Sequence, residues 1–412
     1  MLQSLNPYHM MARMIRSTAH ILALLGVLFI PFPFNIFPYQ STITDAIFGK
    51  IILNLSYYLF STTQDYQEIS SDSSSMYILI FILIGLSVIL SVVLLPFRKW
   101  YEDQDRVLGL IRSILCYYLA LQLLKYGADK IFKSQFYLPE PNILYTPLGN
   151  LDKDILFWST MGTSYAYNVF LGSIEMISAL LLIYKRTRVI GLLLACGIFT
   201  NIIAINFSFD ISVKLYSTFL FIISLLALGP IIPSLYKFLT GIGSNSINLA
   251  SSFSFLSKRS RAFVKISVIL LMSVEVFYPN FKSGNFNDDA APRPFLHGAY
   301  AVQEILEVES SSLMSSLPIK RVFIHRNGYI IFQDLDDEMR DFKLDIDLIN
   351  NQLLLTDYFQ DQIKLNYQYS LSDSILGLQY YYQGKEYKLV AKGLDWRSLP
   401  ALGNVFHWTV DG

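Results

Sequence analysis

The sequence is short of charged residues. Only 16% of its 412 residues are charged and 53% are hydrophobic, whereas about a quarter are charged in an ordinary soluble domain. Basic and acidic residues are balanced at 32 each, so the chain has no overall basic field that would hold nucleic acid by its phosphates. The composition therefore excludes an ordinary cytosolic globule and argues against a nucleic-acid partner.

Cysteine and histidine are also scarce. The two cysteines, Cys116 and Cys196, lie in separate apolar runs, so neither a thiol relay nor a zinc cluster is expected. The histidines are His9, His20, His297, His325 and His407. They lack the spacing of metal ligands, and no phosphate loop, nucleophile elbow or paired-carboxylate motif is present. We therefore expect no metal site, and the motifs assign no enzyme class.

Long apolar runs dominate the first two thirds of the chain. They cover residues 17–39, 76–97, 107–132, 165–184, 188–207, 212–236 and 262–278. Most are near the ~20 residues that cross the hydrocarbon of a bilayer. The first follows Arg13 and Arg16 without a small-residue cleavage pattern, so we interpret it as a retained signal anchor. A shorter run, 47–60, favours an interfacial helix over a re-entrant element, because Lys50 and Asn54 interrupt it.

Basic residues near the ends of the runs predict the orientation. One set of ends carries Arg13, Arg16, Arg98, Lys99, Arg106, Lys185, Arg186, Arg188, Lys237, Lys258, Arg259, Arg261 and Lys265. The opposite set carries Lys50, Lys125, Lys130, Lys133, Lys153 and Lys214. Because basic residues collect on the cytoplasmic side, we expect a cytoplasmic N-terminus. The chain after Asn280 then lies outside.

The last third of the chain has the period of β-structure. Eight segments alternate with period two: 298–305, 319–326, 329–334, 341–348, 352–358, 363–370, 375–382 and 385–393. Tight-turn pairs at Asn327-Gly328, Asn350-Asn351 and Gln383-Gly384 predict antiparallel pairing of successive strands. A lipocalin-like up-and-down barrel and a strongly curved sheet both satisfy these signals.

The expected fold class is therefore an α-helical membrane bundle of about seven spans followed by an antiparallel β-domain. The expected parts are an N-terminal pair of spans with an outer loop (1–104), a four-helix core (105–239), a serine-rich cytoplasmic linker (240–261), a seventh span (262–279) and an extracytoplasmic β-domain (280–412).

Few charged side chains lie inside the spans, where a central charge costs about 2.5–3.5 kcal/mol. Glu175 lies ~15 Å below the outer end of the fourth run, and Lys125 and Lys130 lie toward the outer end of the third. If these runs are neighbours, Lys125 or Lys130 can pair with Glu175, and Asn201 and Asn206 of the fifth run supply hydrogen-bonding groups. We predict a polar ligand-binding pocket from these five residues. The alternative is that they satisfy one another and fix helix packing.

Two further features concern structure. Asp210 and Lys214 open the sixth run four residues apart, which favours an exposed ion pair at the interface. Gly127, Gly162 and Gly172 permit close approach of helices.

Several short motifs lie in the third to sixth runs. They are Tyr126-Gly127-Ala128-Asp129-Lys130-Ile131-Phe132, Met161-Gly162-Thr163-Ser164, Phe170-Leu171-Gly172-Ser173-Ile174-Glu175 and Asn206-Phe207-Ser208-Phe209-Asp210. In these the chain resembles the DoxX-like integral membrane proteins, and Val405-Phe406-His407-Trp408 is similar to the ending of their longer Bacteroidetes-type members. The resemblance implies a four-helix core with Lys130 and Glu175 at recurring positions. In a bacterial inner membrane, the orientation expected from the basic residues then makes the β-domain periplasmic. The resemblance also implies association with quinone-linked respiratory or redox-maturation proteins.

Three functions follow as hypotheses. The first is an inner-membrane protein whose core binds a quinone-like or lipid-like molecule as an accessory to redox or envelope chemistry, with quinone as the candidate cofactor. The second is an envelope interaction protein in which the helices are an anchor and the β-domain binds a partner or a hydrophobic ligand outside the cell. The third is a membrane enzyme, for which Lys130 or Glu175 would have to be the general base.

Overall fold

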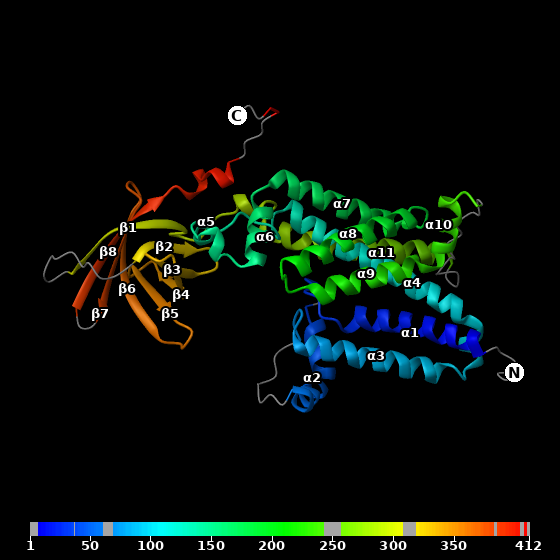
Figure 1. The fold of residues 1–412 in the computed structure, drawn as a ribbon. Helices are drawn as coiled ribbons and strands as arrows, with labels where there is room; N and C mark the ends of the chain where they lie inside the picture. The colour runs from blue at the N-terminus through cyan, green and yellow to red at the C-terminus, as the bar shows by residue number, and fades with distance from the viewer. Residues whose placement is uncertain are drawn as a thin grey trace. The chain divides into compact units, whose positions relative to one another are not determined.

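The computed structural model describes residues 7–36, 38–60, 69–242, 257–307, 319–382, 385–403 and 408–409. The chain divides into two compact units. The helical unit contains residues 1–135 and 166–286, and the barrel unit contains residues 136–165 and 287–412. Residues 136–165, which lie between two helices of the expected core, therefore group with the β-domain (Figure 1).

The helical unit is built from α1 (Pro7–Phe29), α2 (Gln40–Phe60), α3 (Ser74–Leu94), α4 (Arg98–Ile131), α7 (Tyr165–Ile183), α8 (Arg188–Ser208), α9 (Lys214–Leu228), α10 (Ile232–Leu239) and α11 (Lys258–Ser283). Among the described residues, seven segments are long and apolar enough to cross a membrane: Tyr8–Phe29, Ser74–Leu94, Glu102–Ile131, Tyr165–Ile183, Arg188–Ser208, Lys214–Leu239 and Lys258–Ala290. The predicted number of spans is confirmed, and the chain is a membrane-spanning protein. As expected, α2 is not among the seven.

The predicted bounds of the first span, 17–39, are wrong. The helix begins at Pro7 and ends at Phe29. It stops there because Pro31 disfavours helical geometry at the residue before it and Pro33 follows closely. The side chain of Gln40 then donates to the carbonyl oxygens of Val27, Leu28 and Ile30 at 3.1–3.3 Å, which satisfies the end of α1.

Helix α4 lies at the centre of the helical unit. In an apolar 18-residue stretch of this span 67% of the residues are buried, against 17–44% in the corresponding stretches of the other six spans. The helix contacts α1, α8, α9 and α11. Large apolar side chains on the other helices are exposed, as lipid-facing positions would be: Phe81, Ile89, Ile190, Ile222, Phe263 and Ile266. The apolar surface of the bundle is thus suited to contact with lipid hydrocarbon chains.

Glu275 is an acidic residue within the apolar seventh span, and its carboxylate has hydrogen-bond partners in the same unit. Its carboxylate is buried and accepts hydrogen bonds from the backbone N–H of Asn35 at 2.5 Å and of Ile36 at 2.7 Å. The Asn35 side chain donates in turn to the Glu275 carbonyl oxygen at 3.0 Å. The acid therefore ties α11 to the segment after α1.

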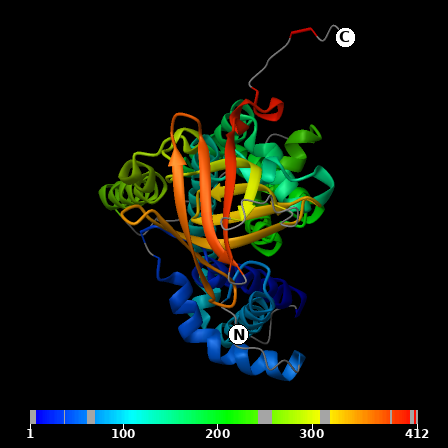
Figure 2. The ribbon, with the colours of Figure 1, turned by 90° about the vertical axis from the view of Figure 1, so that its left-hand side faces the viewer.

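The barrel unit contains a closed eight-stranded barrel in simple sequence order. Its strands are β1 (Gly298–Glu307), β2 (Ile319–His325), β3 (Tyr329–Asp334), β4 (Met339–Asp347), β5 (Gln352–Thr356), β6 (Gln362–Ser370), β7 (Ile375–Tyr382) and β8 (Lys385–Leu394). Every neighbouring pair is antiparallel, and β1 pairs with β8 to close the wall (Figure 2). Of the two expected architectures, the barrel is the one that forms.

The predicted hairpin turns match the observed register. Gly328 has φ +74° and lies between β2 and β3, and Asn351 has φ +51° between β4 and β5. Both adopt the left-handed conformation that tight turns require. The third predicted turn, at Gln383-Gly384, lies outside the described residues, as does His407.

Alternate strand residues fill the barrel. The interior cluster includes Val322, Ile330, Leu344, Leu353, Leu376 and Leu389. At one end, Leu296 packs into this cluster and its carbonyl oxygen accepts a hydrogen bond from the Tyr300 hydroxyl at 2.9 Å. The segment that enters β1 therefore plugs that end.

A second apolar cluster covers the outside of the wall. Phe323 and Trp396 are buried there, and Tyr145 stacks on Phe323 with ring centroids 6.0 Å apart. The 136–165 segment supplies Tyr145 and contains α5 (Pro141–Leu144) and α6 (Lys153–Gly162). Residues between the third and fourth spans thus complete the outer face of the barrel.

Candidate functional site

Lys130 and Glu175, the centre of the predicted pocket, form a buried ion pair. The Lys130 Nζ lies 2.9 Å from Glu175 Oε2, and the two side chains are 8% and 5% exposed. Lys130 also donates to Gln135 Oε1 at 3.0 Å. The expected pairing between the third and fourth spans is therefore present, and it joins α4 to α7.

The other predicted site residues do not join this pair. Lys125 lies with its Nζ 6.0 Å from the centroid of the Phe32 ring, and Asn201 is exposed. Asn206 is buried and donates to Ser217 Oγ at 3.0 Å, within the α8–α9 pair. The interpretation that Asn201 hydrogen-bonds to the ion pair is wrong, because the residue lies on the outer surface of α8. The role of the five residues in ligand binding stays a prediction.

Asp210 and Lys214 form the expected ion pair at 2.7 Å, with Asp210 mostly exposed. Sequence reasoning missed a third member, Asp72. Its carboxylate accepts hydrogen bonds from the backbone N–H of Lys214 and of Leu215, both at 2.9 Å. These are the donors left open at the start of α9, so this group caps a helix.

A different part of the helical unit contains a cavity of about 470 Å³. It is lined by Val27, Ser113, Ile114, Tyr117, Tyr118, Leu121, Ile183, Lys185, Arg188, Arg261, Val264, Lys265, Val268 and Met272. Neither Lys130 nor Glu175 lines it. The residues come from α1, α4, α7, α8, α11 and the α7–α8 turn, so only the folded bundle brings them together.

This helical cavity is apolar along its length and cationic at one end. Lys185 and Arg188 lie at the α7–α8 turn, and Arg261 and Lys265 lie in the first turns of α11. Among the described residues that line the cavity, none is acidic. From Arg261 to Met272 the lining extends eleven residues along α11, or roughly 16 Å at the rise of an α-helix.

Neighbouring groups hold two of these cations in place. Arg188 donates from Nε to the Leu182 carbonyl oxygen at 3.0 Å, and its guanidinium lies 5.6 Å from the Tyr117 ring centroid. Lys265 Nζ lies 4.3 Å from the centroid of Tyr184. Cations held over aromatic rings keep their charge available to an anion, and such contacts contribute about 0.5–1 kcal/mol at exposed sites.

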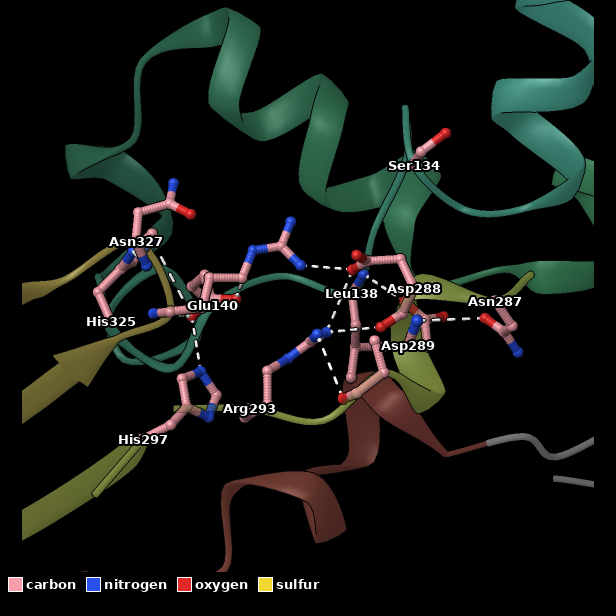
Figure 3. Close-up of polar contacts among 12 residues, drawn as sticks. Ser134, Leu138, Glu140, Asn287, Asp288, Asp289, Arg293, His297, His325 and Asn327 are labelled. Carbon is pink, nitrogen blue, oxygen red and sulfur yellow. Dashed lines mark hydrogen bonds and ion pairs between the residues drawn. The ribbon is translucent and has the colours of Figure 1, made fainter. Parts of the chain in front are cut away.

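The barrel unit contains a buried polar cluster that the sequence did not reveal (Figure 3). The Glu140 carboxylate, 4% exposed, lies 2.8 Å from His297 Nε2 and 3.3 Å from Arg326 Nε. Arg326 also pairs with Asp288, which accepts a further hydrogen bond from Arg293 at 3.2 Å. The cluster ties the 136–165 segment to the end of β2 and to the chain that leads into β1.

The charges of this cluster perturb one another. Burial raises the pKa of the Glu140 carboxyl, but the hydrogen bond from His297 and the charges of His325 and Arg326 outweigh it, so that pKa lies below its ordinary value. Burial, helped by the Arg326 charge, lowers the pKa of His325, against the opposing effect of Glu140. Glu140 therefore stays ionised near pH 7, and His325 takes up its proton only at a lower pH than an ordinary histidine.

This polar cluster does not have the arrangement of a metal-binding site. Within the described ranges, no three His, Cys, Asp or Glu side chains lie together in the arrangement of a metal site. The cluster's carboxylates are already engaged by guanidinium and imidazole groups, which is the pattern of a structural network.

Comparisons with known proteins give one informative relative. No family model matches the chain, and no solved structure matches it. A 111-residue part is 32% identical to the uncharacterized protein YwoB of Bacillus subtilis (strain 168), which is 27% of this chain and 70% of that protein. Over that length, the chain belongs to the same family as YwoB.

Proposed function

We propose that this chain is a bacterial inner-membrane protein whose helical unit binds a lipid-like molecule with an anionic headgroup. The observation that carries the proposal is the helical cavity, which is apolar along roughly 16 Å of α11 and cationic at one end. An acyl or prenyl chain fits the apolar length, and a phosphate fits the end formed by Lys185, Arg188, Arg261 and Lys265.

The chemistry favours an anionic lipid over a neutral quinone. Four cations without an acid among the lining residues leave a net positive end. A basic pocket between transmembrane helices on the cytoplasmic side is a recurring form of site for anionic lipid headgroups. A quinone would use the apolar walls, but it carries no negative charge to complement these cations.

The orientation belongs to the same proposal. The cationic end carries the basic residues that favour the cytoplasmic side. The cavity then opens at the cytoplasmic leaflet, and the barrel unit is periplasmic. We also propose that α4, α7, α8 and α9 are a DoxX-like core, and that the bound lipid serves an accessory role in envelope or redox processes.

Lipid retention by the full-length protein tests this function. The protein is exchanged into detergent with dioleoylphosphatidylglycerol, dioleoylphosphatidylcholine or ubiquinone, and native mass spectrometry measures what it keeps. We expect retention of the phosphatidylglycerol. Lys185→Gln combined with Lys265→Gln should weaken it roughly 25-fold, because each cation near an anionic lipid contributes about 1 kcal/mol.

Lys237→Gln combined with Lys258→Gln is the matched control, because it removes the same charge from basic residues that do not line the cavity. If the control loses as much phosphatidylglycerol, the effect is due to general surface charge and not to the cavity. Equal retention of phosphatidylcholine or preferred retention of ubiquinone would also contradict the proposal.

A further inference from the structure

The barrel contains a cavity of its own, at the end opposite the plug. It has a volume of about 330 Å³, which falls at the lower end of the ~300–1,000 Å³ typical of small-molecule sites. Most of its lining is apolar and comes from the seven strands β2 to β8: Ile319, Phe332, Phe342, Leu355, Ile363, Leu365, Leu378 and Leu389. The wall of the barrel thus surrounds a space that the described side chains leave unfilled.

The strand ends explain why the cavity lies there. β3 ends at Asp334 and β4 begins at Met339, and β5 ends at Thr356 with β6 beginning at Gln362. Side chains near these ends line the cavity, whereas Leu296 fills the interior at the other end. The barrel is therefore closed at one end and hollow at the other, which is the form of a cup.

Tyr380 places a buried hydroxyl on the inner wall of the cup. The Tyr380 hydroxyl is fully shielded from solvent and has no hydrogen-bond partner among the described residues. Tyr380 lines the cavity, and its ring packs against Tyr387 with centroids 5.6 Å apart. Burial raises the pKa of Tyr380 to about 12, so the hydroxyl stays protonated and can donate.

A buried donor without a partner costs about 1–3 kcal/mol. The Tyr380 hydroxyl recovers that cost if a ligand oxygen accepts its hydrogen bond. A carboxylate ligand is disfavoured, because Asp334 and Glu338 line the cavity beside Arg340 and leave it without a net positive charge. The Asp334 carboxylate is also occupied by the turn, where it accepts from the backbone N–H of Asp336 and of Glu338 at 2.9 Å.

We propose that the barrel binds a neutral, mainly apolar small molecule with a carbonyl or ether oxygen, which accepts a hydrogen bond from Tyr380. This site is separate from the helical cavity and does not depend on the function proposed for it. The apolar lining provides most of the binding energy through burial, and Tyr380 selects for a polar atom at one position.

Photolabelling with benzophenone tests this site, because the probe is a neutral diaryl ketone that inserts into nearby C–H bonds under light. The full-length protein in nanodiscs is irradiated with the probe, and peptide mass spectrometry locates the label. Benzophenone also enters the bilayer, so labelling of the helical unit is the internal reference. We expect label on strand residues that line the cup, in excess of label elsewhere in the barrel unit.

Two variants and a control make the result specific. Tyr380→Phe keeps the ring and removes the donor, so the probe concentration for half-maximal labelling should rise roughly 3–10-fold, as for the loss of one hydrogen bond. Ile363→Trp adds bulk at a half-exposed rim position and should abolish the cup label. Tyr358→Phe removes a hydroxyl that bonds Asp341 at an exposed site, so it should change nothing.

Labelling that Ile363→Trp leaves intact, in a protein whose circular dichroism is unchanged, would overturn the site. Loss of label in Ile363→Trp together with wild-type labelling in Tyr380→Phe would overturn the assignment of the donor. Absence of label from the barrel unit, while the helices are labelled, would overturn the whole proposal.

Discussion

Gly127 on α4 and Gly172 on α7 face each other at backbone contact. A Cβ atom at position 172 would lie 2.5 Å from the Gly127 carbonyl oxygen, and one at position 127 would lie 2.7 Å from the Gly172 carbonyl oxygen. This approach brings α4 and α7 close enough for Lys130 to reach Glu175. The predicted role of both glycines in helix packing is confirmed.

Gly172→Ala should therefore destabilise the helical unit. The added methyl group overlaps backbone and must push the two helices apart, which costs about 1–3 kcal/mol in a well-packed core. Thermal unfolding in detergent measures the change. Gly197→Ala is the control, because a Cβ there meets nothing within 4 Å and alanine favours a helix by up to ~1 kcal/mol. Equal stability of the two variants would contradict the close packing.

Lys130→Met should destabilise the bundle more strongly. It leaves the buried Glu175 carboxylate without its cation, and removal of one partner from a buried pair costs about 3–5 kcal/mol. Lys130→Met combined with Glu175→Leu should regain most of that loss, because the double variant buries no lone charge. Stability is read from denaturation, and bound lipid from native mass spectrometry. Undiminished stability with lost ligand would instead support the predicted role of this pair as a ligand site.

Acid should weaken the barrel unit in two steps. The pKa of His325 is lowered from its ordinary 6.5, so the fold favours the neutral ring, and that contribution is lost as pH falls below 6.5. The pKa of Glu140 is lowered from its ordinary 4.5, so its contribution is fully present above 4.5 and is lost as pH falls through the folded value. Near-ultraviolet circular dichroism against pH measures both.

Glu140→Gln should remove the lower of these two steps. At neutral pH it should also cost about 1.5–3 kcal/mol, the contribution of a charge-assisted hydrogen bond. Arg326 keeps Asp288 as a partner, so the loss stays below that of a fully orphaned charge. A variant that unfolds at the same acid pH as the wild type would show that Glu140 is not the titrating group.

The spans and strands could be predicted because their signals are local. Apolar residues that alternate with polar ones mark the inward side of a strand, as Leu365 and Tyr367 do, and a long apolar run marks a membrane span. The sequence left open whether the sheet closes into a barrel, since closure depends on the pairing of Ala299 with Leu394, at the two extremes of the sheet. The alternation of apolar residues along a strand does not show which distant strand it pairs with.

The site was harder to predict for the same reason. Lys130 and Glu175 stood out, because a charge inside a span is rare. The helical cavity did not, since its walls are ordinary apolar positions and its cations are also those of the positive-inside pattern. Glu140 gave one weak signal, a single acid between Pro139 and Pro141, and its partners His297 and Arg326 are more than 150 residues away.

The pairing of β1 with β8 has a consequence for recognition. A sheet that returns to its own first strand offers no unpaired row of N–H and C=O groups, so it cannot extend itself with a strand from another chain. In the described barrel, linear peptides that bind by β-augmentation thus find no docking edge where neighbouring strands pair, which for β1 and β2 is the stretch Gly298–Ala301. A protein that associates with the paired part of the wall must recognise side chains and turns, and such recognition can be altered one residue at a time without opening the sheet.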